Sequence, residues 1–265
     1  MLTNVLVEEV EKKFDMAGAF LDVSKGLSGE TISSLILVGI ICLLCIYIAI
    51  RAKFTNPLKR PWGIVFLAEV GVEFFDGLVE SIMGKRYRAF GGFIMAVGVY
   101  LFMAFIWGLT GLPSPIVYLA TPLSLGLTTF VLIHATSMRY KKFRYFKRYI
   151  EPIPIFLPIN LISMWAPLLS LTMRLFGNAL AGWTVMTLIY SVVGGLGDTV
   201  CEMAGQAVPA GTFIAPFVTP ILHAYFDLFS GLIQTTVFLF LSMIFISNEG
   251  PEDEDIEELA MKGGK

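Results

Sequence analysis

Long apolar runs separated by short polar stretches dominate this sequence. A helix of about 20 apolar residues crosses the hydrocarbon core of a bilayer, which is about 30 Å thick. Each run is long enough to reach across or deep into such a core as a helix. The pattern therefore predicts five membrane-embedded helices, at 31–50, 90–112, 123–138, 152–195 and 212–247.

The polar stretches between the runs indicate how the helices are connected. The proline-rich segment 113–122 is a turn, so 90–138 is expected to be a helical hairpin. The segment 194–211 is expected to be a loop, which makes 152–247 a second and longer hairpin. Together 31–247 is predicted to form a single membrane domain, flanked by a polar segment, 1–30, and an acidic tail, 248–265.

The segment 62–85 has a different pattern, because its apolar residues alternate with four carboxylates. Glu69, Glu73, Asp76 and Glu80 are separated by steps of 4, 3 and 4, which places them on one face of a helix. Each carboxylate at the centre of a membrane helix costs about 2.5–3.5 kcal/mol on insertion scales. This segment is therefore predicted to be an amphipathic helix at the membrane surface.

The composition supports a membrane protein. Of the 265 residues, 56% are hydrophobic and 15% are charged, whereas soluble domains carry about 25% charged residues. The mean hydropathy is +0.75. The net charge of -2 gives no indication of nucleic-acid binding.

The distribution of Lys and Arg predicts the orientation, because basic loops remain in the cytoplasm. The connections 51–61 and 139–149 are basic, whereas 113–122 and 194–211 contain no base. The first pair is therefore placed in the cytoplasm and the second pair outside. The N-terminal segment then lies outside and the acidic C-terminal tail lies in the cytoplasm, in a multi-pass protein.

Arg174 is the only charged residue between Leu168 and Tyr190. It belongs to a face of small and polar residues with steps of 3, 4, 3, 4, 4 and 3, and a second polar stripe follows on the last helix. Two such stripes on consecutive long helices indicate a hairpin that lines a wet path or faces another subunit. The first stripe is Asn160, Ser163, Pro167, Ser170, Arg174, Asn178 and Ala181; the second is His223, Asp227, Ser230 or Gly231, and Gln234.

Two interpretations of these polar residues remain open from the pattern alone. Arg174 and Asp227 could form a structural ion pair, and Asn178 and Gln234 could form an interhelical hydrogen bond. Alternatively, ionisable residues inside a membrane mark the path of an ion or a substrate.

The sequence "LSLTMRLFGNALAG" (169–182) resembles the signature of subunit a of F-type ATP synthases. The preceding "EPIPIFLPINLIS" (151–163) and the later "DLFSGLIQTTVFLFLSMIFIS" (227–247) resemble the family's last two helices. The layout is also similar, with an outside N-terminus, a surface helix after the first span, and a basic loop before the long hairpin.

The resemblance implies a non-catalytic stator subunit in the cell (inner) membrane of a bacterium, with no cofactor or metal. Its long hairpin would be tilted against a rotating c-ring, and b-type subunits of the peripheral stalk would be further partners. Two half-channels would lead ions, expected to be protons, to the ring carboxylates. An arginine suits the barrier between them, because its charge cannot be titrated off.

The resemblance also implies roles for individual residues. Arg174 would be the gate with Asn178 beside it, Gln234 would face them, and Asp227 with His223 would lie in the outer half-channel. Two departures from the family are Trp183, nine residues after the arginine where a carboxylate or histidine is frequent, and the pair Pro122 and Ser124, where Asp-x-Asn is frequent. Further candidates to line the channels are Ser170, Asn160, Ser163, Ser230, Asp198, Glu202 and Ser124.

Two other function classes require features that the sequence does not display. A stand-alone secondary transporter with a site near Arg174 and Asp227 would be favoured by inverted repeats, which the sequence does not display. An intramembrane enzyme would need a nucleophile with a base or a set of metal ligands. The two histidines, His134 and His223, lie on separate spans and offer neither.

Overall fold

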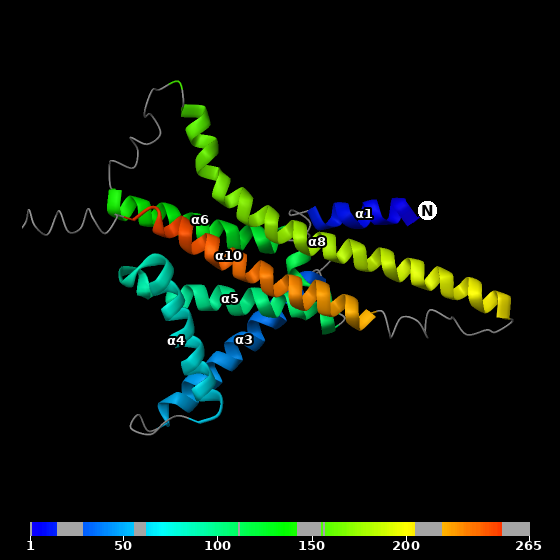
Figure 1. Ribbon diagram of the computed structural model, residues 1–265, viewed down its shortest axis with the longest axis horizontal. Helices are drawn as coiled ribbons and strands as arrows, with labels where there is room; N and C mark the ends of the chain where they lie inside the picture. Colours follow the sequence, from blue (N-terminus) through cyan, green and yellow to red (C-terminus); the bar gives the residue numbers. More distant parts are fainter. Residues whose placement is uncertain are drawn as a thin grey trace, which may run out of the picture. The chain divides into compact units, whose positions relative to one another are not determined.

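The computed structural model describes residues 2–14, 29–55, 62–110, 112–141, 155, 157–204 and 219–250. Throughout these ranges the regular secondary structure is helical, and they contain no strand (Figure 1). The all-α prediction is therefore confirmed for the part of the chain that is described.

The helices with assigned bounds follow one another along the described ranges, and the residues 219–223 directly before η5 are helical as well. The α-helices are α1 (Leu2–Phe14), α3 (Gly29–Lys53), α4 (Ile64–Met83), α5 (Gly91–Ile106), α6 (Ala120–Lys141), α8 (Leu157–Ala204) and α10 (Ser230–Ser247). The short turns are η1 (Lys85–Phe90), η2 (Trp107–Thr110), η3 (Pro115–Val117) and the π-helical η5 (Ala224–Phe229).

Four helical segments are long and apolar enough to cross a membrane, among the residues described: Thr31–Lys53, Lys85–Thr110, Leu157–Gly195 and Thr219–Ser247. The fifth predicted membrane helix, 123–138, is helical within α6 but is not among these four. Hydroxyl side chains and a histidine interrupt its apolar residues. The polar residues of α6 before Arg139 are Thr121, Ser124, Thr128, Thr129, His134, Thr136 and Ser137.

The long helix α8 differs from its predicted bounds. It has 48 residues and continues to Ala204, so the loop predicted to begin at Gly194 is wrong at its start. An interior glycine costs a helix only about 1 kcal/mol, and no proline occurs between Pro167, inside the helix, and Pro209. At 1.5 Å per residue α8 is about 72 Å long, more than twice the thickness of a hydrocarbon core.

The contacts of the chain divide it into two compact units. The first comprises residues 1–50, 98–122 and 174–237, and the second comprises 51–97, 123–173 and 238–265. Leu101, Phe105 and Leu175 are buried in the first unit. The second unit buries a larger set of apolar side chains, among them Val79, Ile94, Leu168, Leu171, Phe238, Met243 and Ile246.

Helix α3 exposes most of its side chains, although they are apolar almost all round. Leu43 is 69% exposed and Ile46 is 56% exposed, whereas Leu37 is buried. A helix that is apolar on every side is stable in lipid or in a protein core. This exposure therefore fits a helix with most of its surface against lipid, and Arg51 and Lys53 end it as the basic flank does in membrane spans.

Helix α4 has the amphipathic character that the spacing of its carboxylates predicted. Val79 and Met83 are buried, whereas Glu69 and Glu73 are exposed. In η1 and just beyond α4, bases approach the other two acids of the same unit. Arg88 Nε lies 3.7 Å from Asp76 Oδ2, and Lys85 Nζ lies 3.9 Å from Glu80 Oε1.

Within the first unit, α10 approaches α5 closely at Gly231. A Cβ atom at Gly231 would lie 2.6 Å from Phe105 Cβ and 2.8 Å from its Cγ. These atoms are at the root of the phenylalanine side chain, so a change of rotamer would not remove the clash. We expect Gly231→Ala to destabilise the subunit by about 1–3 kcal/mol.

The measurement is the temperature at which the subunit dissociates from the purified complex. Gly39→Ala in α3 is the matched control, because nothing lies within 4 Å of the added Cβ there. Equal dissociation temperatures for the two variants would contradict the close packing of α10 on α5.

Candidate functional site

The side chain of Arg174 is exposed on α8 and lies in the first unit. No described residue forms an ion pair or a hydrogen bond with its guanidinium group. In particular, Asp227 belongs to the same unit and pairs with His223 instead. The structural Arg174–Asp227 pair, one of the two interpretations left open by the sequence, is therefore not formed here.

One turn after Arg174, α8 is joined to α10 by a hydrogen bond. Asn178 Nδ2 donates to Gln234 Oε1 at 2.5 Å. Gln234 is only 3% exposed, and its Nε2 has no partner among the described residues. The bond fixes the registration of the two helices beside the arginine, which is the interhelical role that the sequence left open for this pair.

Asp227 lies in a π-helical segment, η5. The N–H of Ser230 donates to the C=O of Tyr225, five residues earlier, instead of the usual four. Single π-turns inside α-helices occur frequently at functional sites. The wider turn interrupts the regular spacing on which the predicted stripe of His223, Asp227 and Gln234 was based.

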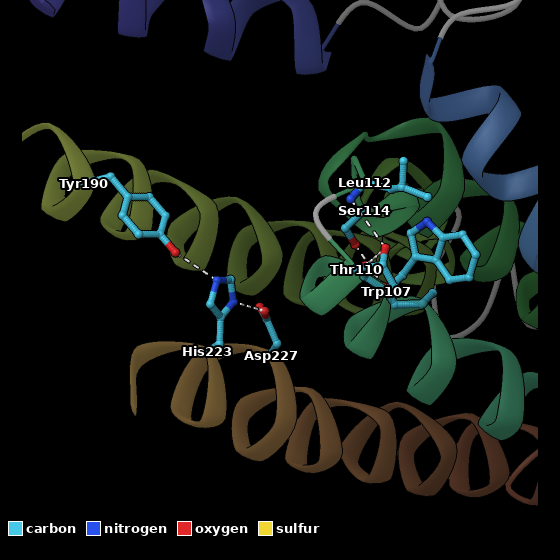
Figure 2. Close-up of polar contacts among 8 residues, drawn as sticks. Trp107, Thr110, Leu112, Ser114, Tyr190, His223 and Asp227 are labelled. Carbon is cyan, nitrogen blue, oxygen red and sulfur yellow. Dashed lines mark hydrogen bonds and ion pairs between the residues drawn. The ribbon is translucent and has the colours of Figure 1, made fainter. Parts of the chain in front are cut away.

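Two hydrogen bonds connect Tyr190, His223 and Asp227 in a chain (Figure 2). The Tyr190 hydroxyl and His223 Nε2 are 2.8 Å apart. On the other side of the ring, His223 Nδ1 lies 2.5 Å from Asp227 Oδ2. The tyrosine comes from α8, whereas the histidine and the aspartate are one helical turn apart around η5.

This arrangement has the connectivity of a proton relay. With Asp227 ionised, the Nδ1–H of His223 donates to the carboxylate and the Tyr190 O–H donates to Nε2. A proton that arrives at Nε2 makes the ring an imidazolium, which can then release its Nδ1 proton to Asp227. The side chains of His223 and Asp227 are 24% and 22% exposed, so neither is fully buried.

The pair faces a cavity of about 560 Å³ that lies entirely within the first unit. Its wall includes Asn178, Trp183 and Tyr190 from α8, the pair Asp227 and His223, and residues of the turn after α5. In that turn, which Figure 2 shows, Ser114 Oγ–H donates to the carbonyl of Ala104 at 2.9 Å. The cavity connects the neighbourhood of Asn178 with the relay residues.

Gly108, in η2 directly after α5, allows this turn to approach Asp227. A Cβ atom at this position would lie 3.1 Å from Asp227 Oδ2. A side chain there would crowd the carboxylate, so the glycine leaves the Asp227 oxygens room to face the cavity.

The remaining predicted channel residues are distributed over the chain. Ser230, the first residue of α10, is half-buried in the first unit. The side chains of Asp198 and Glu202 lie outside the described residues. Four others belong to the second unit, where Ser163 borders a small cavity of about 40 Å³: Ser124, Asn160, Ser163 and Ser170.

Tyr190 and Lys13 are among the cavity residues that the sequence did not predict. Tyr190 follows Trp183 and Thr187 at steps of 4 and 3, so the helical period could have placed it on the same face. Lys13 lies in α1, and no local pattern connects it with residues more than a hundred positions later. Among the described residues, no group of three or more His, Cys, Asp or Glu side chains is placed to hold a metal ion.

Known proteins include relatives that align with most of the chain. It is 28% identical to ATP synthase subunit a of Mycoplasma genitalium over 233 residues, 83% of this chain and 80% of the relative. It is 26% identical to ATP synthase subunit a of a Sulfurihydrogenibium species over 217 residues, 78% of this chain and 94% of that protein.

A third relative is named for its ion. ATP synthase subunit a, sodium ion specific, of Propionigenium modestum is 29% identical over 205 residues, 77% of this chain and 61% of that protein. The sequence pattern of one family, described as ATP synthase A chain, matches residues 31–247. That match confirms the resemblance seen in "LSLTMRLFGNALAG", and the chain belongs to the ATP synthase A chain family.

Proposed function

We propose that this chain is the ion-translocating stator subunit of a rotary F-type ATP synthase, with Arg174 as the barrier between two half-channels. The observation that carries the proposal is the state of Arg174, which is exposed and has no partner among the described residues. A permanent cation in an apolar helix is costly, and it would gain a partner when a ring carboxylate passes. The hydrogen bond between Asn178 and Gln234 holds the helices beside it.

The cavity with Tyr190, His223 and Asp227 is the outer half-channel in this proposal. Its wall extends to Asn178, one turn from the arginine. A proton entering from outside would pass along the two hydrogen bonds to Asp227 and from there through water toward the ring. In this proposal the relay takes the place of the titratable side chain that is absent at position 183, where this chain has tryptophan.

Protons are proposed as the coupling ion, because a chain of hydrogen bonds through an imidazole transfers protons and provides no cage for a metal cation. The sodium specificity in the name of the Propionigenium modestum relative is a property of that protein. The alternative of a stand-alone secondary transporter is disfavoured by the family to which the chain belongs.

The proposal includes the placement of the chain in the membrane. Residues 31–247, the range that the family matches, form one multi-pass membrane domain with α6 as a fifth embedded helix and α4 on the cytoplasmic surface. The segment 1–30 lies outside and 248–265 in the cytoplasm. The tilted α8–α10 hairpin faces the c-ring, b-type stalk subunits bind elsewhere, and ATP chemistry belongs to partner subunits.

The relay is tested by Tyr190→Phe in the purified complex in liposomes. Removal of the hydroxyl leaves His223 Nε2 without its donor and without a route to water through the tyrosine. We expect the rate of ATP-driven proton uptake to fall about tenfold, since positioned proton transfer contributes about 10²–10⁴-fold in general and water can partly replace one hydroxyl.

The matched control is Tyr225→Phe, which removes a hydroxyl from an exposed tyrosine of η5 that does not line the cavity. We expect parental proton uptake from this variant. Equal uptake by both variants would remove Tyr190 from the path.

A further inference from the structure

Glu249, which follows the end of α10, is buried in the second unit. It is 9% exposed, and no other acid among the described side chains is buried. Its Oε2 atom accepts a hydrogen bond of 2.8 Å from the hydroxyl of Ser137 in α6, which is 1% exposed. The two residues are 112 positions apart in the chain, so this contact joins the turn after α10 to α6.

The turn that carries Glu249 is held by its own backbone. The N–H of Glu249 donates to the carbonyl of Ile246 at 3.3 Å, and the N–H of Gly250 donates to the carbonyl of Ser247 at 2.9 Å. The family match ends at residue 247, so it gives Glu249 no role. The burial of this acid needs a separate reason, since an apolar side chain would fill the same space without the cost of desolvation.

The carboxylate borders the small cavity of about 40 Å³ in the second unit. The polar members of its wall are His134 and Ser137 from α6, Ser163 from α8, and Glu249 itself. A buried water molecule needs about 10–15 Å³ and two to four polar partners. The cavity is therefore large enough and polar enough to hold at least one water molecule.

Both helices of the wall offer acceptors to such a water. Pro167, inside α8, also lines the cavity; it has no N–H, so the carbonyl of Ser163, four residues earlier, lacks its usual donor within the helix and can accept from water. On α6, His134 Nδ1 lies 2.9 Å from the carbonyl oxygen of Phe130. Because that oxygen only accepts, Nδ1 carries a proton, and Nε2 is the acceptor nitrogen of the neutral ring.

We propose that this cavity holds water in the inner half-channel and that Glu249 exchanges protons between that water and the cytoplasm. The inference rests on the proposed function, in which the segment 248–265 and the basic end of α6 lie on the cytoplasmic side. Pro167 comes about two helical turns before Arg174 along α8. In that orientation this part of α8 belongs to the cytoplasmic half of the helix.

Each proton that ATP-driven transport moves would pass through Glu249 in three steps. Hydronium in the cytoplasm protonates the carboxylate, the acid gives its proton to the cavity water, and the water passes a proton on to a deprotonated ring carboxylate. Glu249 then returns to its ionised form. Burial disfavours that form and the hydrogen bond from Ser137 favours it, so the environment supports both forms of the group.

The role of Glu249 is tested by Glu249→Gln in the purified complex, in liposomes with the cytoplasmic face outward. The amide oxygen can still accept from Ser137, but the side chain cannot carry the proton. We expect ATP-driven proton uptake to fall about tenfold, less than the 10²–10⁴-fold of a positioned proton-transfer group because water partly replaces it. The matched control is Glu73→Gln, which neutralises an exposed acid of α4 and is expected to keep the parental rate.

The order of two variants separates proton exchange from anchoring of the chain end. Glu249→Asp retains a carboxylic acid on a side chain shorter by one methylene, so it reaches Ser137 less well than glutamine does. Proton exchange predicts about threefold more uptake from Glu249→Asp than from Glu249→Gln, whereas an anchor predicts the reverse order. The reverse order, equal rates, or loss of the subunit from the purified Glu249→Gln complex overturns the proposal.

The pH outside the liposomes gives a readout that a structural role would not change. In Glu249→Gln, hydronium must protonate the cavity water directly, so we expect its rate relative to the parental rate to rise about fivefold when the outside pH is lowered by about one unit. The other titratable group of the wall, His134, is present in both proteins. A ratio that does not change with pH overturns the proposal.

Failure of this inference is distinguishable from failure of the proposed function. Parental uptake in Glu249→Gln together with failed uptake in Arg174→Ala would remove the role of Glu249 and leave the two half-channels in place. Normal coupled uptake in Arg174→Ala would remove the proposed function itself.

Discussion

Arg174→Ala is expected to abolish ATP-driven proton uptake in liposomes while ATP hydrolysis by the complex continues. Without the guanidinium, a ring carboxylate that has released its ion meets no cation between the half-channels, and protons can cross directly from one to the other. Proton uptake is followed by quenching of a pH-sensitive dye, and hydrolysis is followed in the same vesicles. Normal coupled uptake would remove the central claim of the proposed function.

The structure also predicts that the variant assembles. Arg174 is exposed and has no ion pair among the described residues, so its removal leaves no buried acid without a partner. Surface substitutions of this kind change stability by about 0.5 kcal/mol or less, whereas breaking a buried pair costs about 3–5 kcal/mol. Assembly is measured as the amount of variant subunit that copurifies with the complex.

Two further substitutions distinguish charge from position. Arg174→Lys is expected to fail as well, because a lysine loses its proton when desolvated and lacks the planar fork of the guanidinium. Arg139→Ala, which removes an exposed arginine near the end of α6, is expected to pump at the parental rate. If the Arg139 variant also lost pumping, the effect of Arg174→Ala would come from the change in net charge and not from the position of the arginine.

The helical segments could be predicted from the sequence because each follows from local composition. The spacing of Glu69, Glu73, Asp76 and Glu80 gave the amphipathic character of α4, and its bounds differ from the prediction by only a few residues. The predicted start of the 194–211 loop was wrong, because α8 continues through Gly194 and Gly195 to Ala204. In a long apolar helix, two glycines cost less than the packing and hydrogen bonds that continue through them.

The candidate site could be predicted only where its residues share a helix. Arg174 and Asn178 lie one turn apart, and His223 and Asp227 likewise, so the helical period related the members of each pair. The joining of α8 to η5 through Tyr190 depends on tertiary packing that no period specifies. The π-turn at Asp227 could not be predicted either, because the six residues of η5 have no distinctive composition.

The environment of Trp183 shows what a sequence comparison alone leaves out. At this position the chain departs from the family by lacking a titratable group. In the structure the indole ring holds the ammonium of Lys13 from a distant helix. The structure thus places a charge near a position where the sequence has no titratable group, and this charge is positive.

Asp227→Asn is expected to leave an assembled complex in which proton flux falls about 100-fold, the lower end of the range for a positioned proton-transfer group. Asparagine can still accept the hydrogen bond from His223 Nδ1–H through its amide oxygen, so the local packing is retained. It cannot take the proton, so the relay ends at the imidazole. Proton uptake and the amount of copurified subunit are measured on the same preparation.

The partner of Asp227 separates this expectation from a structural role. Because the carboxylate pairs with His223 and not with Arg174, its neutralisation leaves no arginine uncompensated. If the aspartate and the histidine act in one relay, Asp227→Asn, His223→Asn and the double variant should lose similar amounts of flux, since residues that act as a unit are not additive.

If the fold-loss of flux in the double variant equals the product of the two single fold-losses, the two residues act in separate paths. Loss of the subunit from the purified Asp227→Asn complex would assign the carboxylate to assembly, and parental flux in that variant would exclude it from translocation altogether.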